Sequence, residues 1–166
     1  MPNLRLVLAT ESDVPVILEF IRALAEYEKL AHAVEATEEQ LRATLFGPKP
    51  AAEVVLAYWD QDCAGFALFF PSYSTFQARP GIYLEDLYVK PHLRGLGLGL
   101  ALLQHLAALA LKRGCGRLEW SVLNWNEPAI RFYMKLGAMP LSEWTRYRLT
   151  DAALENLAHP AGTGRD

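Results

Sequence analysis

The sequence lacks the features that mark several large classes of protein. It has no apolar stretch approaching ~20 uninterrupted residues, which is the length a membrane-spanning helix needs. Its first residues have neither the apolar core nor the cleavage site of a signal peptide. No run of basic residues exceeds Lys112-Arg113, and the net charge is −3 with a pI near 5.8. We therefore expect a cytoplasmic protein that engages neither a membrane nor nucleic acid.

Metal-binding and redox patterns are also missing. Cys63 and Cys115 are far apart and form no C-x-x-C pair, so both are expected to be small buried apolar residues. The four histidines show neither H-x-x-x-H nor H-E-x-x-H spacing. The sequence predicts no metal site.

Composition and patterning favour one compact α/β domain. A chain of 166 residues with 52% hydrophobic content can bury one substantial core but leaves no room for a second ordinary domain. No internal repeat or low-complexity segment occurs. We expect a single domain over residues 1–158, followed by a loose tail, 159–166, that is rich in proline and glycine.

Hydrophobic period and capping residues predict the order of the elements. Helices are predicted at residues 14–30, 37–46, 97–112 and 126–135. Strands are predicted at residues 4–8, 54–59, 64–70, 82–89 and 118–123, with two further antiparallel strands within 139–149.

The most informative stretch is the hexapeptide R-G-L-G-L-G, residues 94–99, between a predicted strand and a predicted helix. Glycines at alternate positions let backbone N–H groups crowd round an anion at the positive end of the helix dipole. A P-loop would require Lys and then Ser or Thr after the last glycine, whereas Leu100 and Ala101 follow here. The stretch predicts a phosphate cradle that is not a P-loop.

Two alternatives stay open for this stretch. A dinucleotide-binding fingerprint would need a glycine where Leu100 stands and a strand that enters the first glycine directly, although Glu119 falls at the distance of a ribose-binding acid. A glycine-rich helix start that binds no ligand is the simpler alternative.

The pattern Arg-x-x-Gly-x-Gly, residues 94–99, resembles the acetyl-CoA pyrophosphate loop of the GCN5-related N-acetyltransferases (GNAT). Residues 84–89 (L-E-D-L-Y-V) and the segment 124–138 resemble the spermidine/spermine N1-acetyltransferase group and its thialysine-acetylating relatives. The likeness extends from Leu4 to about Leu157. It implies an α/β GNAT fold, with a central, mostly antiparallel, twisted sheet of six to seven strands and helices on both faces.

The resemblance implies an acetyl-CoA-dependent enzyme that acetylates a primary amine of a small molecule by direct transfer in a ternary complex. It also implies a homodimer with residues 144–149 at the subunit boundary, although burial within one subunit explains the same apolar residues. A non-catalytic acyl-CoA-binding sensor would share the cradle but lack an acid or a base.

The resemblance supplies both proton-transfer groups. Neutralising an alkylammonium of pKa near ~10.4 at pH 7 costs roughly 4–5 kcal/mol, and Glu85, acting through water, matches the family base. Tyr133 matches the family tyrosine that protonates the departing thiolate. Each residue also has a purely structural alternative. Glu85 could be a solvated charge at the sheet edge, and Tyr133 could be an aromatic residue that packs beside Phe132.

The cofactor contacts are also carried over from the family. Pantetheine is expected to lie along the strand before the loop, with the pyrophosphate on loop amides and on the Arg94 guanidinium. The implied residues are Leu87, Tyr88, Val89, Arg94, Gly95, Leu96, Gly97, Leu98, Gly99, Leu100 and Asn126. A surface salt bridge is the alternative for Arg94, and helix capping accounts equally for Asn126.

The amine site is expected at Tyr27 and Glu28, which resemble the family's amine-site edge, together with Glu85 and Asp86. In an ideal strand Asp86 points to the face opposite Glu85 unless a bulge reorients it. Residues 73–76 lack an acidic residue that polyamine acetylators carry. This departure favours a lysine-like amino acid over spermidine, and another small primary amine or an antibiotic stays open.

Overall fold

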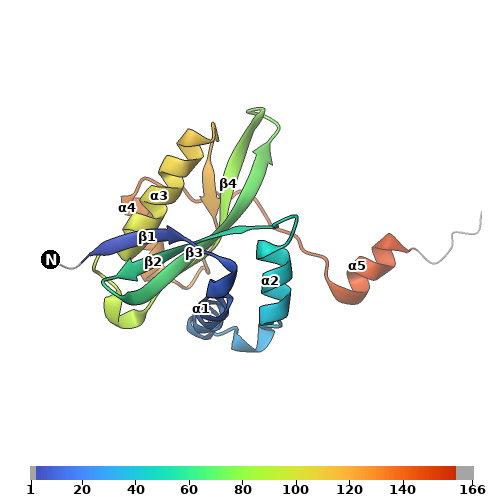
Figure 1. Ribbon diagram of the computed structural model, residues 1–166. Helices are drawn as coiled ribbons and strands as arrows, with labels where there is room; N and C mark the ends of the chain where they lie inside the picture. Colours follow the sequence, from blue (N-terminus) through green and yellow to red (C-terminus); the bar gives the residue numbers. More distant parts are fainter. Residues whose placement is uncertain (1–2, 160–166) are drawn as a thin grey trace, which may run out of the picture. The chain divides into compact units, whose positions relative to one another are not determined.

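Figure 1 presents the computed structural model, which describes residues 3–159. The chain divides by its internal contacts into two compact units, with the boundary between Leu123 and Asn124. The expected single domain over 1–158 stays a prediction, and all but the first residue of the expected tail lies outside the described residues.

The first unit contains one five-stranded sheet in which the strands follow chain order. Its strands are β1 (Leu4–Leu8), β2 (Glu53–Trp59), β3 (Asp62–Ser74), β4 (Arg79–Val89) and β5 (Leu118–Trp120). The first four strands pair antiparallel, whereas β5 runs parallel to β4 and pairs only with Ile82–Leu84. A helix separates β4 from β5, as a parallel connection requires.

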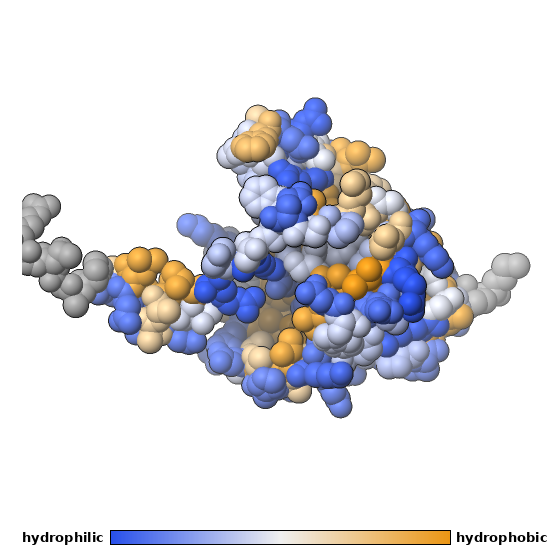
Figure 2. All heavy atoms as spheres, turned by 180° about the vertical axis from the view of Figure 1, so that it is seen from behind, coloured by the Kyte–Doolittle hydropathy of each residue, from blue (hydrophilic) through white to orange (hydrophobic). Residues whose placement is uncertain are grey.

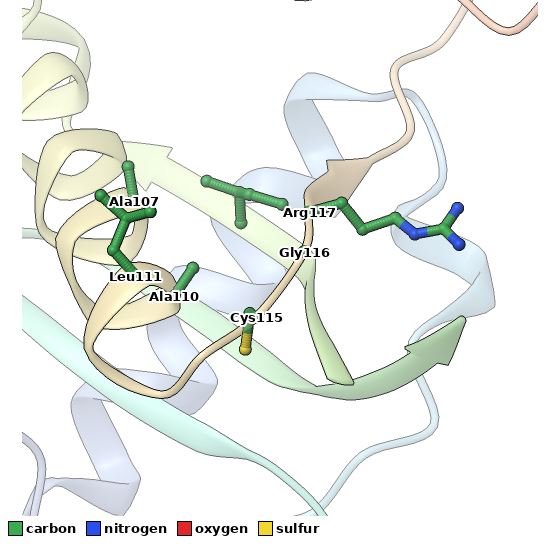
Figure 3. A pocket seen from close by; sticks show the side chains of 7 residues that line it. Ala107, Ala110, Leu111, Cys115, Gly116 and Arg117 are labelled. Atoms are coloured by element: carbon green, nitrogen blue, oxygen red, sulfur yellow. The ribbon is translucent and has the colours of Figure 1, made fainter. Parts of the chain in front are cut away.

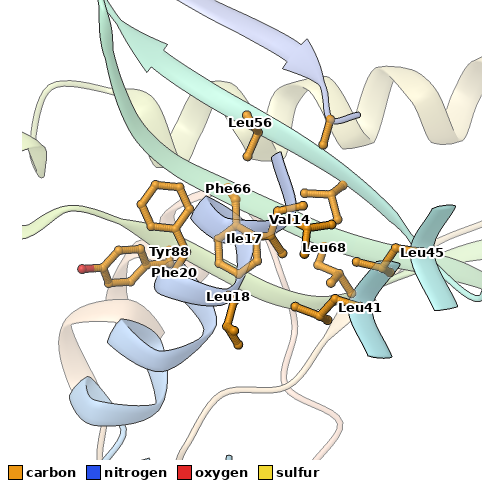
Figure 4. Close-up of a cluster of buried hydrophobic side chains, with 12 residues drawn as sticks. Val14, Ile17, Leu18, Phe20, Leu41, Leu45, Leu56, Phe66, Leu68 and Tyr88 are labelled. Carbon is orange, nitrogen blue, oxygen red and sulfur yellow. The ribbon is translucent and has the colours of Figure 1, made fainter. Parts of the chain in front are cut away.

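Helices cover both faces of this sheet, as expected. Helices α1 (Val14–Tyr27) and α2 (Glu38–Phe46) lie on one face, and α3 (Leu98–Lys112) lies on the other (Figure 1). On the α1 face Phe20 stacks on Phe66, with ring centroids 5.5 Å apart (Figure 4). On the α3 face the helix buries one leucine-rich stripe, Leu98, Leu102 and Leu106.

The expected capping box at the start of α2 is confirmed. Thr37 caps α2 through a reciprocal pair of hydrogen bonds with Gln40, in which each side chain accepts from the other residue's backbone N–H at 3.2 and 2.9 Å.

Helix α1 ends at Tyr27 and not at Leu30 as predicted. Lys29 adopts a left-handed backbone with φ 61°, which stops the helix although the apolar period continues.

The hairpin strands differ in length from the prediction. Strand β3 continues past Phe70 to Ser74, and β4 begins at Arg79 instead of Ile82. The predicted limits left out Pro71 and Pro80, and proline normally interrupts a central strand. Here they lie where β3 and β4 pair with each other as a long ribbon (Figure 1).

The prediction for the C-terminal third was partly wrong. Strand β5 ends at Trp120 rather than Leu123, and residues 139–149 contain no strand. The sheet of the described chain therefore has five strands instead of six to seven. Alternating apolar residues suit a strand, but a strand also needs a neighbour for its backbone hydrogen bonds, and local sequence does not supply one.

Up to residue 159 the second unit contains two helices, α4 (Glu127–Lys135) and α5 (Asp151–Ala158). Helix α4 begins directly after the predicted cap residue Asn126 and ends at Lys135 as predicted, and Gly137 follows with φ 85°. Helix α5 was not predicted, although Thr150 at the N-cap position and an acidic residue in the first turn are helix-start signals. Three short 3-10 turns complete the described chain: η1 (Glu11–Asp13), η2 (Ala31–Ala33) and η3 (Pro91–Leu93).

Candidate active site

A β-bulge in β4 re-aims the predicted base and its neighbour. In the β3–β4 register Leu68 pairs with Asp86 and Phe69 pairs with Leu84, so Glu85 is the extra residue. Paired residues share a face, and Leu68 belongs to the core on the α1 side. Asp86 therefore faces α1, whereas without the bulge it would share the face of Leu84.

The bulge brings together three carboxylates that the sequence analysis assigned to the amine site: Glu28, directly after α1, and Glu85 and Asp86 in β4. Burial, followed by the charges of Glu85 and Glu28, raises the pKa of Asp86 to about 6. Burial and the charge of Glu85 also raise the pKa of Glu28. These carboxylates form a concentration of negative charge that suits an ammonium group.

The raised pKa of Asp86 predicts a pH-dependent effect on stability. A carboxyl whose pKa rises on folding contributes stability that is present below its unfolded pKa and is lost as pH rises through about 6. Asp86→Asn should therefore raise the free energy of unfolding at pH 8 by on the order of 2–3 kcal/mol, and change it much less at pH 4. Urea unfolding at both pH values measures this difference.

Asp62→Asn is the matched control with the opposite sign. The Lys90 ammonium, 2.7 Å from the Asp62 carboxylate, lowers the pKa of Asp62, so this residue stabilises the fold at neutral pH and ceases to do so in acid. Asp62→Asn should lower stability at pH 8. An Asp86→Asn variant that is equally destabilised at both pH values would contradict the half-buried, charge-repelled state of this carboxyl.

The glycine-rich stretch forms the turn between η3 and α3. Gly95 and Gly97 have φ of +80° and +91°, which are left-handed values that favour glycine, and Gly97 occupies the N-cap position of α3. A Cβ atom built at Gly95, Gly97 or Gly99 would meet nothing within 4 Å. The first amides of a 15-residue helix thus adjoin open space, as an anion cradle requires.

The edge of β4 before this turn offers backbone groups to a peptide-like ligand. The Lys90 N–H donates to the Ala64 carbonyl of β3 at 2.8 Å. Since backbone groups alternate along a strand, those of Leu87 and Val89 point away from β3, toward the side where β5 runs. The β4–β5 pairing has ended at Leu84, so the position predicted for pantetheine is compatible with the strand geometry.

Arg94 follows η3 and makes contacts that the sequence did not reveal. Its Nε donates to the Val89 carbonyl at 2.9 Å, and its guanidinium carbon lies 4.8 Å from the ring centroid of Tyr27 and 5.7 Å from that of Tyr88. Within residues 3–159 it forms no ion pair, contrary to the alternative of a surface salt bridge. A hollow of about 260 Å³ adjoins it, lined by Ala23, Glu26, Tyr27, Tyr88, Pro91 and Arg94.

The remaining predicted site residues lie in the second unit. Asn126 occupies the N-cap position of α4, where the capping alternative placed it, and its side chain makes no capping hydrogen bond. Tyr133 is a half-buried residue of α4 whose ring centroid lies 5.6 Å from that of Phe132. The expected aromatic neighbour is present, and the role of the hydroxyl stays a prediction.

A second hollow in the first unit contains none of the predicted site residues. It has a volume of about 250 Å³ and lies between the end of α3 and the start of β5 (Figure 3). It is lined by Ala107, Ala110, Leu111, Cys115, Gly116, Arg117 and Leu118. Its lining contains no carboxylate and no aromatic ring.

Neither a metal-binding cluster nor a membrane-spanning helix occurs among residues 3–159. In residues 3–159 no three His, Cys, Asp or Glu side chains are grouped so that they could hold a metal ion. No helix of that range is both long enough and apolar enough to span a membrane. Cys63 and Cys115 are free and half-buried rather than fully buried as expected.

Sequence comparisons agree with this geometry. The family model for the acetyltransferase (GNAT) family matches residues 18–138. The chain is 39% identical over 169 residues to a thialysine N-epsilon-acetyltransferase of Mus musculus, covering 95% of this chain and 99% of that protein. It is 35% identical to an L-ornithine N5-acetyltransferase of Arabidopsis thaliana, covering 92% and 87% of the two chains.

Comparison with solved structures gives the same fold. An integron cassette protein from the mobile metagenome of V. cholerae superposes with a TM-score of 0.78 at 26% identity, covering 94% of this chain and 98% of that one. The predicted α/β fold class is confirmed, with the smaller strand count given above. Glu119, the acid that kept the dinucleotide alternative open, instead lies 3.5 Å from Arg117 in an ion pair.

Proposed function

Because the chain belongs to the acetyltransferase (GNAT) family and is an acyltransferase enzyme, we propose that it uses acetyl-CoA to acetylate the terminal amine of a small molecule in a ternary complex. The observation that carries this proposal is the pairing of an open glycine cradle at α3 with a group of carboxylates on the neighbouring strand. The cradle suits an anionic cofactor, and the carboxylates suit a cationic acceptor.

The residues fit acetyl-CoA at two places. Amides from Leu96 to Leu100 would hold the pyrophosphate, assisted by the Arg94 guanidinium. Backbone groups of Leu87 and Val89 would hold the peptide-like pantetheine arm. When bound, acetyl-CoA would supply an activated acetyl thioester within reach of the acceptor amine.

Two side chains would manage the protons. The Glu85 carboxylate, exposed at the bulge, would accept a proton from the incoming ammonium through water, and Asp86 and Glu28 would hold the cation beside it. The Tyr133 hydroxyl would donate its proton to the departing sulfur. A phenol with pKa about 10 can protonate a thiolate with pKa about 8.5 if it is held at that atom.

The substrate class follows from the acceptor side. Thialysine and L-ornithine, which the names of two relatives specify, are amino acids with an amine at the far end of the side chain. The missing acidic residue in 73–76 removes one site for a second ammonium of a polyamine. We therefore propose a lysine-like amino acid as the substrate.

Thermal unfolding with nucleotide ligands tests the cofactor assignment. Acetyl-CoA and CoA, at about 100 times their dissociation constants, should each raise the melting temperature by about 5 °C or more, since a ligand that binds only the native state stabilises it. NAD and NADP at equal concentration should have little effect. Selective stabilisation by NAD or NADP would overturn the proposal.

We also propose that the active form is a homodimer in which a second copy covers residues 144–149. Trp144, Tyr147 and Leu149 are 74%, 90% and 48% exposed, and apolar side chains also gather on α5 (Figure 2). Exposed aromatic residues in this number are typical of interfaces. In light scattering at micromolar concentration we expect a mass about twice 18.6 kDa.

Trp144→Ser supplies the matched variant for the dimer. It should shift the mass toward the monomer and lower amine turnover more than acetyl-CoA binding, because each subunit would complete its partner's amine site. A monomeric wild-type protein with full activity would contradict the proposed dimer.

A further inference from the structure

The side chain of Arg94 is fixed by three contacts, all to the strand and helix that border the cradle. The Val89 carbonyl holds Nε, and the rings of Tyr27 and Tyr88 both lie within cation–π distance of the guanidinium. Tyr88 is itself rigid, because it is only 8% exposed and its ring centroid lies 5.6 Å from that of Phe20 (Figure 4). Tyr27, the last residue of α1, is 39% exposed.

These contacts orient the guanidinium without neutralising it. Arginine carries five N–H donors, of which only Nε is used here, and no carboxylate among residues 3–159 forms an ion pair with it. An unrestrained arginine loses rotamer entropy when it is fixed on a ligand. A guanidinium that two rings and a carbonyl already hold has less entropy left to lose.

From this arrangement we propose that Tyr27 is a positioning residue for Arg94, and that its ring holds the guanidinium ready for the cofactor phosphates. This inference rests on the proposed function, because it requires CoA as the ligand of the cradle. It assigns Tyr27 a second role, since the sequence analysis placed this residue only in the amine site.

The position of Tyr27 gives the contact a further consequence. Glu28, one of the three acceptor-site carboxylates, directly follows Tyr27 at the end of α1. Tyr88 lies two residues after Asp86 in β4 and packs against α1 through Phe20. The two aromatic contacts of Arg94 therefore connect the cradle to α1 and β4, beside which the three carboxylates lie. A substitution of Tyr27 should therefore change the affinity for CoA.

A double-mutant cycle with CoA as the probe tests this role. CoA carries the phosphates but no acetyl group, so its affinity, measured by isothermal titration calorimetry, is independent of turnover. We expect Tyr27→Leu to weaken CoA binding about five- to tenfold, which corresponds to roughly 1.0–1.4 kcal/mol. Tyr27→Phe keeps the ring and should stay within about twofold of the wild type.

The second arm of the cycle uses Arg94→Ala. Arg94→Ala should itself weaken CoA binding, and in that background Tyr27→Leu should cause no further loss, because the ring then has no guanidinium to hold. A loss from Tyr27→Leu that is equally large with and without Arg94 would mean that the ring acts independently of Arg94, and the inference would be wrong.

The remaining outcomes separate this inference from the proposed function. If the wild type binds CoA and Tyr27→Leu binds it equally well, the positioning role is wrong and the proposed function stands. If the wild type itself does not bind CoA, the proposed function fails first. Melting temperatures of all four variants identify any loss that comes from unfolding.

Discussion

Replacing Tyr133 by Phe is expected to lower kcat by about 10²-fold or more while leaving acetyl-CoA affinity nearly unchanged. The substitution removes one hydroxyl and keeps the ring that packs 5.6 Å from Phe132. If the hydroxyl protonates the departing thiolate, its loss slows the chemical step and not binding. Steady-state kinetics combined with a direct acetyl-CoA titration measure both effects.

Tyr58→Phe is the matched control, because it also removes one hydroxyl from a partly buried tyrosine, here on β2. This variant should retain wild-type kcat. If Tyr133→Phe also retains it, the proton donor is another group, and packing beside Phe132 is a sufficient account of this tyrosine.

Gly99→Val is expected to weaken acetyl-CoA binding by more than tenfold, or about 1.4 kcal/mol. Gly99 has no left-handed φ, and a Cβ atom there meets no protein atom within 4 Å. The substitution therefore leaves the backbone unstrained, and valine has a better helix propensity than glycine. Its bulk would occupy the space assigned to phosphate, so affinity should fall without a fall in melting temperature.

Gly97→Val should have the same effect on affinity, but it adds strain because φ at this position is +91°. Gly114→Val controls for that strain, since Gly114 also has a left-handed backbone, with φ +68°, and open space around it after α3. The control should lose stability and keep acetyl-CoA affinity. If Gly99→Val and Gly97→Val fold and bind acetyl-CoA with wild-type affinity, the assignment of this loop as a phosphate cradle is wrong.

The order of elements in the first unit could be predicted because each carries its own local signal. The capping pair at Thr37 and Gln40 starts α2, and Gly95 and Gly97 precede α3, of which Gly99 is the second residue. Such features depend on residues within one or two turns of each other, where period and capping decide the conformation. The limits of β3 and β4 were less predictable, since long-range pairing overrode their prolines.

The arrangement of the candidate site depends on contacts that are distant in sequence. The bulge at Glu85 is a shift of register between β3 and β4, so it cannot be predicted from residues 82–89 alone. The stacking of Arg94 on Tyr27 joins residues 67 positions apart. These contacts therefore depend on how β3, β4 and α1 pack together, and local sequence does not determine that packing.

The carboxylates illustrate why a site can oppose the stability of its fold. Asp86 is half-buried beside Glu85 and Glu28, and its ionised form costs folding free energy at neutral pH. The same negative charge is what an ammonium substrate requires. The expected gain in stability of Asp86→Asn at pH 8 would therefore accompany weaker amine binding.

The most direct test of the account is the product formed from acetyl-CoA and defined amines. Purified protein would be incubated with acetyl-CoA and thialysine, L-ornithine or spermidine, and the products analysed by mass spectrometry with fragmentation. We predict one acetyl group on the side-chain amine of thialysine and L-ornithine, formed faster than any product of spermidine. Protein that binds acetyl-CoA but acetylates none of these amines would contradict the account.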